Sequence, residues 1–296
     1  MPAQTLLDPK VLSRLSTIEL VAKTVVEGFV AGMHRSPYFG FSQEFSEYRA
    51  YVPGDDPRFV DWNVYARTER IYLKRFKGET NTALVLIFDS SASMGYGSQG
   101  VTKIQYARYL AASLAYLALH QHDAVSIIVF DEVVRRYIAP STRPGQLHGV
   151  LHALEHAEPN TRTNIDQPFE HFRQFHTKRG LVAVISDFYF APEKILKAVR
   201  PLCYHGNDIM LFHVLDPAEI SPKLSDSTLL EDMETGDRME VAPEYAAREY
   251  KKKIQEHIDE LKREARGSGS DYLLLDTSKP LDGALKEYFS FRQRRM

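Results

Sequence analysis

"LVLIFDSSASMGYGSQG", residues 84–100, is the stretch that decides the fold of this chain. It starts with an apolar run of strand length, which ends abruptly at Asp89, and Ser and Gly residues follow. An apolar run without polar alternation is typical of a strand that is buried on both faces of a parallel sheet. The sequence therefore predicts a core strand at 83–88 with a polar turn at its carboxyl end.

Strand-like and helical patterns alternate along the rest of the chain. Further apolar runs of strand length cover residues 124–130, 181–186 and 208–214. The helical patterns cover about residues 103–120, 145–157, 166–176 and 192–203. This alternation predicts an α/β fold, with a mostly parallel sheet and helices on both faces. Residues 133–140 follow the second strand so closely that we expect an antiparallel edge strand there.

Other segments flank this alternation. An apolar helical stripe at 16–31 precedes an aromatic and charged stretch with a strand at 70–76, and a hairpin around Thr235-Gly236-Asp237 is predicted at 226–241. A charged helix at about 243–266, a strand at 271–276 and a closing helix follow. We therefore divide the chain into an N-terminal helix and β-rich segment (1–80), a core (81–215), a hairpin and long helix insertion (216–269), and a last strand and helix of the core (270–296).

Composition excludes several classes of protein. The 296 residues are 44% apolar with a formal net charge of −2, which suits a globular protein and argues against nucleic acid as the main partner. Cys203 is the single cysteine, so no internal disulfide framework is expected. The N-terminus lacks the pattern of a signal peptide, and the longest apolar runs are too short to span a membrane. We expect a cytoplasmic protein without a membrane span.

The polar turn after the first core strand has more hydroxyls than helix capping needs. Thr102 and Gln105 fit a capping box for the next helix, which leaves the serines before it without that task. Asp89, Ser91 and Ser93 alternate, so their side chains converge if the turn is extended. A carboxylate and two hydroxyls are hard oxygen donors, which suit Mg²⁺ or Mn²⁺. In an open α/β sheet such a ligand site belongs at the carboxyl ends of the strands.

Two more oxygen donors stand at the expected edge of the sheet. Asp187 closes the strand "LVAVISD", and Thr163 lies in the loop "EPNTRTNID" between two helices. With these residues the pattern resembles the von Willebrand factor A-type domain, whose metal-ion-dependent adhesion site uses Asp-x-Ser-x-Ser, a loop Thr and a strand-end Asp. The resemblance implies that Ser91, Ser93 and Thr163 coordinate the metal directly, while Asp89 and Asp187 act mainly through bound waters.

One departure from that pattern concerns the loop. Arg162 precedes Thr163 where the family usually has a small residue, which leaves Thr161 as an alternative hydroxyl. The metal is expected to be Mg²⁺ or Mn²⁺, with Ca²⁺ as a further candidate. Hydroxyl ligands leave the ion with excess positive charge, so an Asp or Glu of a protein partner is the natural additional ligand.

A wider resemblance covers nearly the whole chain. "YRAYVPGDDPRFVDWNVYARTERIYLKRF", residues 48–76, followed by "DSSASM" at 89–94, resembles a group of bacterial von Willebrand A-like proteins, the domain-of-unknown-function family numbered fifty-eight. Members of this family typically accompany MoxR-type AAA+ ATPases. The resemblance implies a non-enzymatic, metal-dependent interaction module that serves as an adaptor for such an ATPase or recruits its client.

The competing hypothesis is a metal-dependent hydrolase or nucleotide-using enzyme on the same sheet. Gly95, Gly97 and Gly100 spell G-x-G-x-x-G, but "DSSASM" separates them from the strand. "HALEH" at 152–156 matches the H-x-x-E-H of zinc peptidases, but no third ligand is identifiable. A phosphotransferase with Asp89 as nucleophile would need a carboxylate where Ser91 stands. We therefore expect no enzyme activity.

A charged segment near the N-terminus leaves two alternatives open. Its residues form either an internal ion-pair network that pins the N-terminal arm to the sheet, or a partner surface. The residues concerned are Asp55, Asp56, Arg58, Asp61, Trp62 and Arg67.

Overall fold

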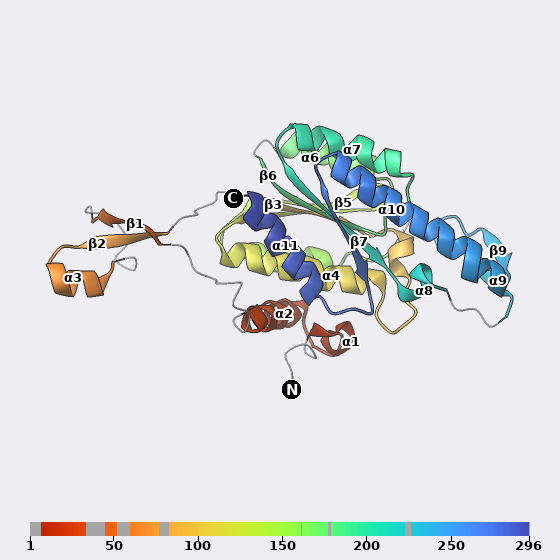
Figure 1. Ribbon diagram of the computed structural model, residues 1–296, viewed down its shortest axis with the longest axis horizontal. Coiled ribbons are helices and arrows are strands. Elements are labelled where there is room, and N and C mark those ends of the chain that lie inside the picture. Colours follow the sequence, from red (N-terminus) through yellow and green to blue (C-terminus); the bar gives the residue numbers. More distant parts are fainter. Residues whose placement is uncertain are drawn as a thin grey trace. The chain divides into compact units, whose positions relative to one another are not determined.

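The computed structural model describes residues 7–33, 45–51, 60–76, 83–160, 162–176, 179–222 and 226–295 (Figure 1). The chain folds as two compact units. Residues 33–81 form one unit, and residues 1–32 together with 82–296 form the other. The N-terminal helix predicted at 16–31 therefore belongs to the same unit as the sheet.

The larger unit is built on a mostly parallel sheet, as the alternation of strands and helices predicts. Its strands are β3 (Ala83–Asp89), β4 (Ala124–Phe130), β5 (Val134–Ser141), β6 (Gly180–Ser186), β7 (Asp208–Leu215) and β10 (Asp271–Asp276). Their order is β10-β7-β6-β3-β4-β5, and in this sheet every neighbouring pair is parallel except β4 and β5. The predicted antiparallel edge strand at 133–140 is confirmed as β5.

The strand order reverses at β3. The chain places β4 and β5 on one side of β3 and then returns to its other side with β6. Connections therefore leave the carboxyl ends of β3 and β6 in opposite directions, and a crevice for a ligand opens between such strands. Asp89 ends β3, and Asp187 directly follows β6.

Helices cover both faces of this sheet (Figure 1). On one face lie α6 (Asp166–Phe175), α7 (Pro192–Tyr204) and α10 (Lys251–Gly267), whose apolar side chains pack with alternate residues of β3, β4, β6 and β7. On the other face α4 (Lys103–His120) contacts the central strands, α5 (Gln146–Glu155) packs against α4 and β4, and α11 (Asp282–Arg295) contacts β10. The fold is thus a three-layered α/β sandwich of helices around a buried sheet.

The N-terminal helices are part of this unit, and α2 contacts α11. They are α1 (Pro9–Leu12) and α2 (Ile18–Met33). The rings of Phe29 in α2 and Phe289 in α11 stack with centroids 5.1 Å apart. The apolar stripe of α2 is buried, as its periodicity predicts, so this helix is part of the core packing.

The predicted capping box and hairpin are both present. Thr102 Oγ1 accepts a hydrogen bond from Gln105 N, and the Gln105 side chain accepts one from Thr102 N, at the start of α4. The segment between β7 and α10 contains α8 (Pro217–Ile220) and the hairpin strands β8 (Thr228–Glu231) and β9 (Arg238–Val241). After the hairpin, α9 (Pro243–Tyr245) continues through a π-helical turn at Ala246–Tyr250 into α10. Gly236 has φ +76° in the hairpin turn, a conformation that glycine adopts without strain.

The smaller unit contains β1 (Phe45–Ala50), α3 (Trp62–Thr68) and β2 (Tyr72–Phe76), with β1 and β2 antiparallel. Asp61 is buried and caps α3, because its Oδ1 accepts a hydrogen bond from Val64 N at 3.2 Å. Trp62 is 60% exposed and meets Tyr65 edge to face. Asp55, Asp56 and Arg58 of the proposed ion-pair network lie outside the described residues, so that hypothesis stays open.

None of the helices in the described parts of the chain is both long enough and apolar enough to cross a membrane.

Candidate functional site

Asp89 is the buried carboxylate at the end of β3. Its Oδ1 accepts a hydrogen bond from Ser91 N at 2.8 Å, and its Oδ2 accepts one from the hydroxyl of Ser186 at the end of β6. Burial and the nearby carboxylate of Asp187 raise the pKa of Asp89 to about 7, although these hydrogen bonds oppose the shift. Asp89 is thus fixed between the two strand ends, and its occupied oxygens suit orientation of the turn better than nucleophilic attack.

Ser91 and Ser93 converge through a helical turn. We expected an extended turn, but Ser91 precedes a 3₁₀ turn, η3 (Ala92–Gly95), that contains Ser93. Their hydroxyl oxygens lie 3.1 Å apart, within hydrogen-bond distance. Ser90 points elsewhere, because its N and Oγ both donate to the carbonyl of Phe130 on β4. The pair of hydroxyls predicted from the alternation is therefore present, formed by a different backbone conformation.

Thr163 and Asp187 bring two buried oxygens without partners to the same edge. The loop of Thr163 is held beside β4 because Asn164 N donates to the carbonyl of Asp131 at 2.9 Å. Among the described residues, neither Thr163 Oγ1 nor Asp187 Oδ1 has a hydrogen-bond partner, and both atoms are buried. Buried oxygens without partners are costly, and a bound ion or a water at this edge would satisfy them. Thr161, the alternative hydroxyl, lies outside the described residues.

Lys103 is a component of the site that the sequence analysis missed. It is fully buried at the start of α4, and its Nζ lies 2.7 Å from Asp187 Oδ2 and 2.7 Å from Glu219 Oε1. Burial alone would lower the pKa of Lys103, but the two carboxylates outweigh burial and raise it. A lysine in the first turn of a helix is unfavourable for the helix dipole, which was a detectable signal of a local carboxylate.

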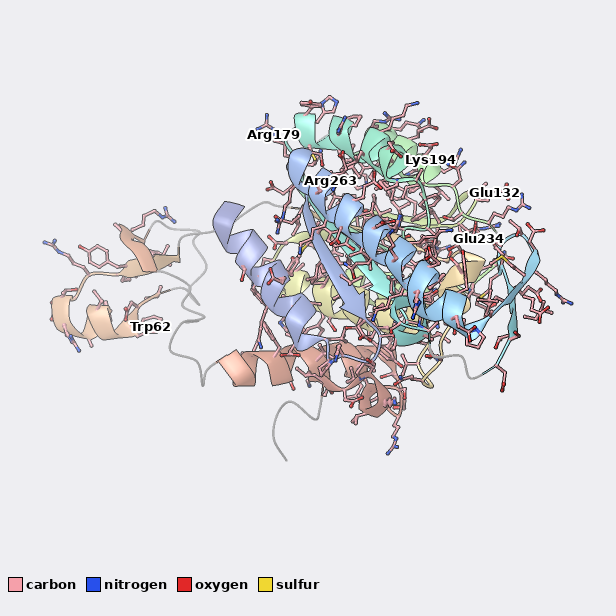
Figure 2. The ribbon with its side chains drawn as sticks, turned by 45° about the vertical axis from the view of Figure 1, so that its right-hand side comes forward. Trp62, Glu132, Arg179, Lys194, Glu234 and Arg263 are labelled. Atoms are coloured by element: carbon pink, nitrogen blue, oxygen red, sulfur yellow. The ribbon has the colours of Figure 1, made fainter. Side chains whose placement is uncertain are left out.

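Glu234 is the second missed component. It lies in the turn between β8 and β9 and is labelled in Figure 2. Ser93 Oγ donates to Glu234 Oε1 at 3.3 Å, and Thr163 N donates to Glu234 Oε2 at 3.3 Å. Burial raises the pKa of Glu234, against the hydrogen bond from Thr163. One carboxylate therefore links the two loops that carry the predicted hydroxyl ligands.

The donor set fits a hard divalent cation. The structure brings all five predicted residues to one edge of the sheet, and oxygens from hydroxyl and carboxylate groups are the donors that Mg²⁺ and Mn²⁺ prefer. Among the described residues no three His, Cys, Asp or Glu side chains form a cluster that could hold a metal. An adhesion-type site uses hydroxyl oxygens beside its carboxylates, so such a cluster is not required. The fit of the site rests on the unpartnered hydroxyl of Thr163 and the unpartnered carboxylate oxygen of Asp187.

The competing motifs have structural explanations. A methyl group on Gly97 would lie 2.7 Å from Thr102 Cα, and Gly100 has φ +87°, so the loop itself requires both glycines. The rings of His152 and His156 stack at 4.1 Å on the exposed side of α5.

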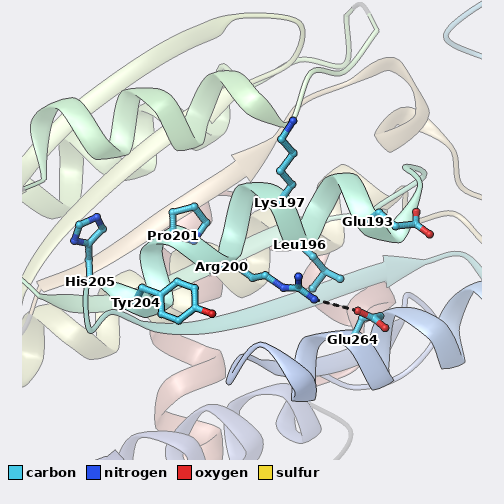
Figure 3. A pocket seen from close by; sticks show the side chains of 8 residues that line it. All are labelled: Glu193, Leu196, Lys197, Arg200, Pro201, Tyr204, His205 and Glu264. Atoms are coloured by element: carbon cyan, nitrogen blue, oxygen red, sulfur yellow. Dashed lines mark ion pairs between the residues drawn. The ribbon is translucent and has the colours of Figure 1, made fainter.

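A cavity of about 540 Å³ lies elsewhere, along α7 (Figure 3). Arg200 of α7 and Glu264 of α10 form an ion pair at 3.5 Å in its wall. None of its lining residues belongs to the strand-end site.

Solved structures are similar to this chain. The crystal structure of the conserved hypothetical protein BatB from Bacteroides thetaiotaomicron matches with a TM-score of 0.50 at 16% identity, over 72% of this chain and 98% of that chain. The SpRpn10 VWA domain matches with a TM-score of 0.43 at 10% identity, over 70% of this chain and 94% of that domain. The strand order and the likeness to BatB define an α/β protein with helices on both faces of a mostly parallel sheet.

The family follows from a second comparison. The family model described as "Protein of unknown function DUF58" matches residues 47–260, and the chain belongs to this family. The uncharacterized protein Mb1516 of Mycobacterium bovis is 26% identical over 292 residues, which cover 97% of this chain and 91% of that protein. The family resemblance drawn from residues 48–76 and 89–94 is therefore confirmed.

Proposed function

We propose that this chain is a non-enzymatic, metal-dependent protein-interaction module. Ser91, Ser93 and Thr163 hold a divalent cation, Mg²⁺ or Mn²⁺ with Ca²⁺ as a further candidate, at the carboxyl ends of β3 and β6. Asp89 and Asp187 support it mainly through waters. The bound ion supplies a positively charged position for an acidic residue of a partner protein.

The unpartnered buried oxygens of Thr163 and Asp187 carry this proposal. A hydrogen-bonded strand-end turn without a ligand would satisfy its buried polar atoms internally. Among the residues that the structure describes, the two oxygens have no partners, although hydroxyls and backbone amides lie nearby in the same loops. A cation that accepts a lone pair from Thr163 Oγ1, and whose bound water donates to Asp187 Oδ1, would remove this deficit.

The protein's own residues prepare the site for binding rather than for reaction. Asp89 orients the turn of Ser91 through the backbone, and Lys103 holds one oxygen of Asp187, so the other oxygen keeps a fixed direction. Both oxygens of Asp89 accept hydrogen bonds, and Ser91 occupies the position where a phosphotransferase would need a second carboxylate. This arrangement favours recognition over hydrolysis.

We assign the partner class from the family resemblance. A MoxR-type AAA+ ATPase or its client is the expected source of the acidic residue, and the cytoplasm is the expected location. The assignment is tested by size-exclusion chromatography of the chain with a MoxR-type ATPase from the same genome, at constant Mg²⁺. Complex formation by the parent and its loss with Asp89→Ala would support the assignment, and equal complex formation would contradict a metal-dependent contact.

Metal binding is tested first by isothermal titration of Mg²⁺ and Mn²⁺ into chelator-treated protein. We expect saturable binding in the parent and none in the double variant Ser91→Ala, Ser93→Ala. Ser90→Ala is the matched control, since it removes a hydroxyl from the same turn that donates to the carbonyl of Phe130 on β4. Binding by this control with loss in the double variant supports the site. Absence of binding in the parent at millimolar metal would contradict the proposal.

A further inference from the structure

The hairpin between β8 and β9 contacts the candidate site through its tip. The contact joins residues that are 141 positions apart, Ser93 and Glu234. Next to it, a methyl group on Gly95 would lie 3.6 Å from Met233 Cε, so the tip also contacts the turn that carries Ser93. Arg162 Nε donates to the carbonyl of Glu234 at 3.3 Å. Both loops of the site therefore contact Glu234.

The hairpin tip has a fixed shape. Asp232 Oδ1 accepts hydrogen bonds from Glu234 N at 2.8 Å and from Thr235 N at 3.0 Å, and Gly236 N donates to the carbonyl of Asp232. These bonds form a local turn that does not depend on the site. The Glu234 carboxylate is therefore presented to the site by a preformed turn.

The strands behind this tip are largely exposed. Leu229 in β8 is 61% exposed and Met239 in β9 is 57% exposed. In these two strands only Val241, the last residue of β9, is buried. A hairpin that is exposed along its strands and attached at its tip can separate from the site without opening the sheet.

We propose that Glu234 is the chain's own acidic ligand of the candidate metal site, and that a partner binds by displacing it with an acidic side chain. This inference rests on the function proposed above and names the regulation of the same site. Glu234 places one oxygen beside Ser93 and the other beside Thr163, which are two of the three direct ligands assigned there. Its carboxylate thus stands where the acid of a partner is expected.

The chemistry of the partner follows from this competition. An intramolecular acid on a short connection acts at an effective concentration in the millimolar range, so an isolated acidic side chain displaces it poorly. A partner needs an Asp or Glu together with contacts to the surface that the hairpin tip leaves. Leu229 and Met239 are exposed apolar side chains of the hairpin strands, so a partner can also contact the hairpin itself.

The test uses Mn²⁺ with the full chain and the variant Glu234→Ala. Glu240→Ala is the matched control, because Glu240 is an exposed carboxylate on the same hairpin in β9. Mn²⁺ affinity is measured by titration, and water on the bound ion is measured by the relaxation of solvent protons. Acetate is added as a small carboxylate probe, and circular dichroism checks folding.

We expect Glu234→Ala to bind Mn²⁺ about 10- to 100-fold more weakly than the parent. The bound ion should relax solvent protons more strongly, because water replaces the carboxylate, and acetate should reverse this increase only in Glu234→Ala. Glu240→Ala should match the parent. If Glu234→Ala matches the parent in affinity and relaxation, while Ser91→Ala, Ser93→Ala abolishes binding, the internal ligand is refuted and the metal site stands. If the parent binds no Mn²⁺, both proposals fail.

Discussion

Replacement of Lys103 by Met should destabilise the larger unit strongly. The Lys103 ammonium is fully buried and lies 2.7 Å from carboxylate oxygens of both Asp187 and Glu219, whose side chains are 0% and 14% exposed. Lys103→Met keeps the apolar stem but leaves both carboxylates without their countercharge. Removal of one partner from a buried ion pair costs about 3–5 kcal/mol in the free energy of unfolding. We expect a loss in this range at pH 7.

The assay is urea unfolding followed by far-ultraviolet circular dichroism in chelator. Lys286→Met is the matched control, because Lys286 forms an exposed i,i+4 pair with Asp282 at 3.0 Å and its loss should cost at most about 0.5 kcal/mol. The double variant Lys103→Met, Glu219→Gln should lose less stability than the sum of the single variants, since one variant already breaks the contact. A loss below about 1 kcal/mol for Lys103→Met would refute the assignment of Lys103 as the countercharge.

Further predictions concern the core, acid stability and the loop hydroxyl. Gly180→Ala places a methyl group against the carbonyl of Ala83 on the neighbouring strand, so urea unfolding should show a loss of about 1–3 kcal/mol in the free energy of unfolding. Gly283→Ala is the control, because open space surrounds this position, and equal effects of the two variants would contradict the close approach. Burial lowers the pKa of His213 to about 3 from an unfolded value of 6.5, so the unfolded state binds more protons and stability falls as pH drops below 6.5. The parent should lose about 2 kcal/mol more than His213→Gln between pH 6.5 and 4.5, and urea midpoints that fall equally in both proteins would exclude this. Thr163→Val removes a buried oxygen that has no partner among the described residues, so the thermal unfolding temperature in chelator should be unchanged or higher, while titration should show lost Mn²⁺ affinity. A clear loss of stability would mean that the hydroxyl makes a structural hydrogen bond.

The central part of the site was predictable from position alone. Asp89 and Asp187 each follow an apolar run, and the carboxyl ends of parallel strands meet at one edge of a sheet. The α/β alternation therefore brought both residues together without knowledge of any contact. Ser91 and Ser93 were predicted as a pair, although the backbone between them is a 3₁₀ turn instead of an extended one.

Long-range contacts were not predictable in the same way. Lys103 meets Glu219 across 116 positions, and Ser93 meets Glu234 across 141 positions. The alternation of strands and helices predicts where the β-strands of the sheet lie. The positions of α8 and the hairpin depend on how loops pack, and loop packing leaves no periodic pattern of apolar residues in the sequence. Lys103 had a local signal in its place at a helix start, whereas Glu234 is one of many acidic residues in a polar turn and had none.

Trp62 is the single tryptophan of the chain, and it is 60% exposed in the smaller unit. Intrinsic tryptophan fluorescence of the protein therefore reports on the surroundings of residues 33–81, while the backbone signal of the larger unit comes from its sheet and helices. A partner that shifts the emission of Trp62 touches or reorganises the smaller unit, and one that binds without a shift leaves its indole in the same environment. The chain thus carries a natural optical label that can assign a binding partner to one of its two units.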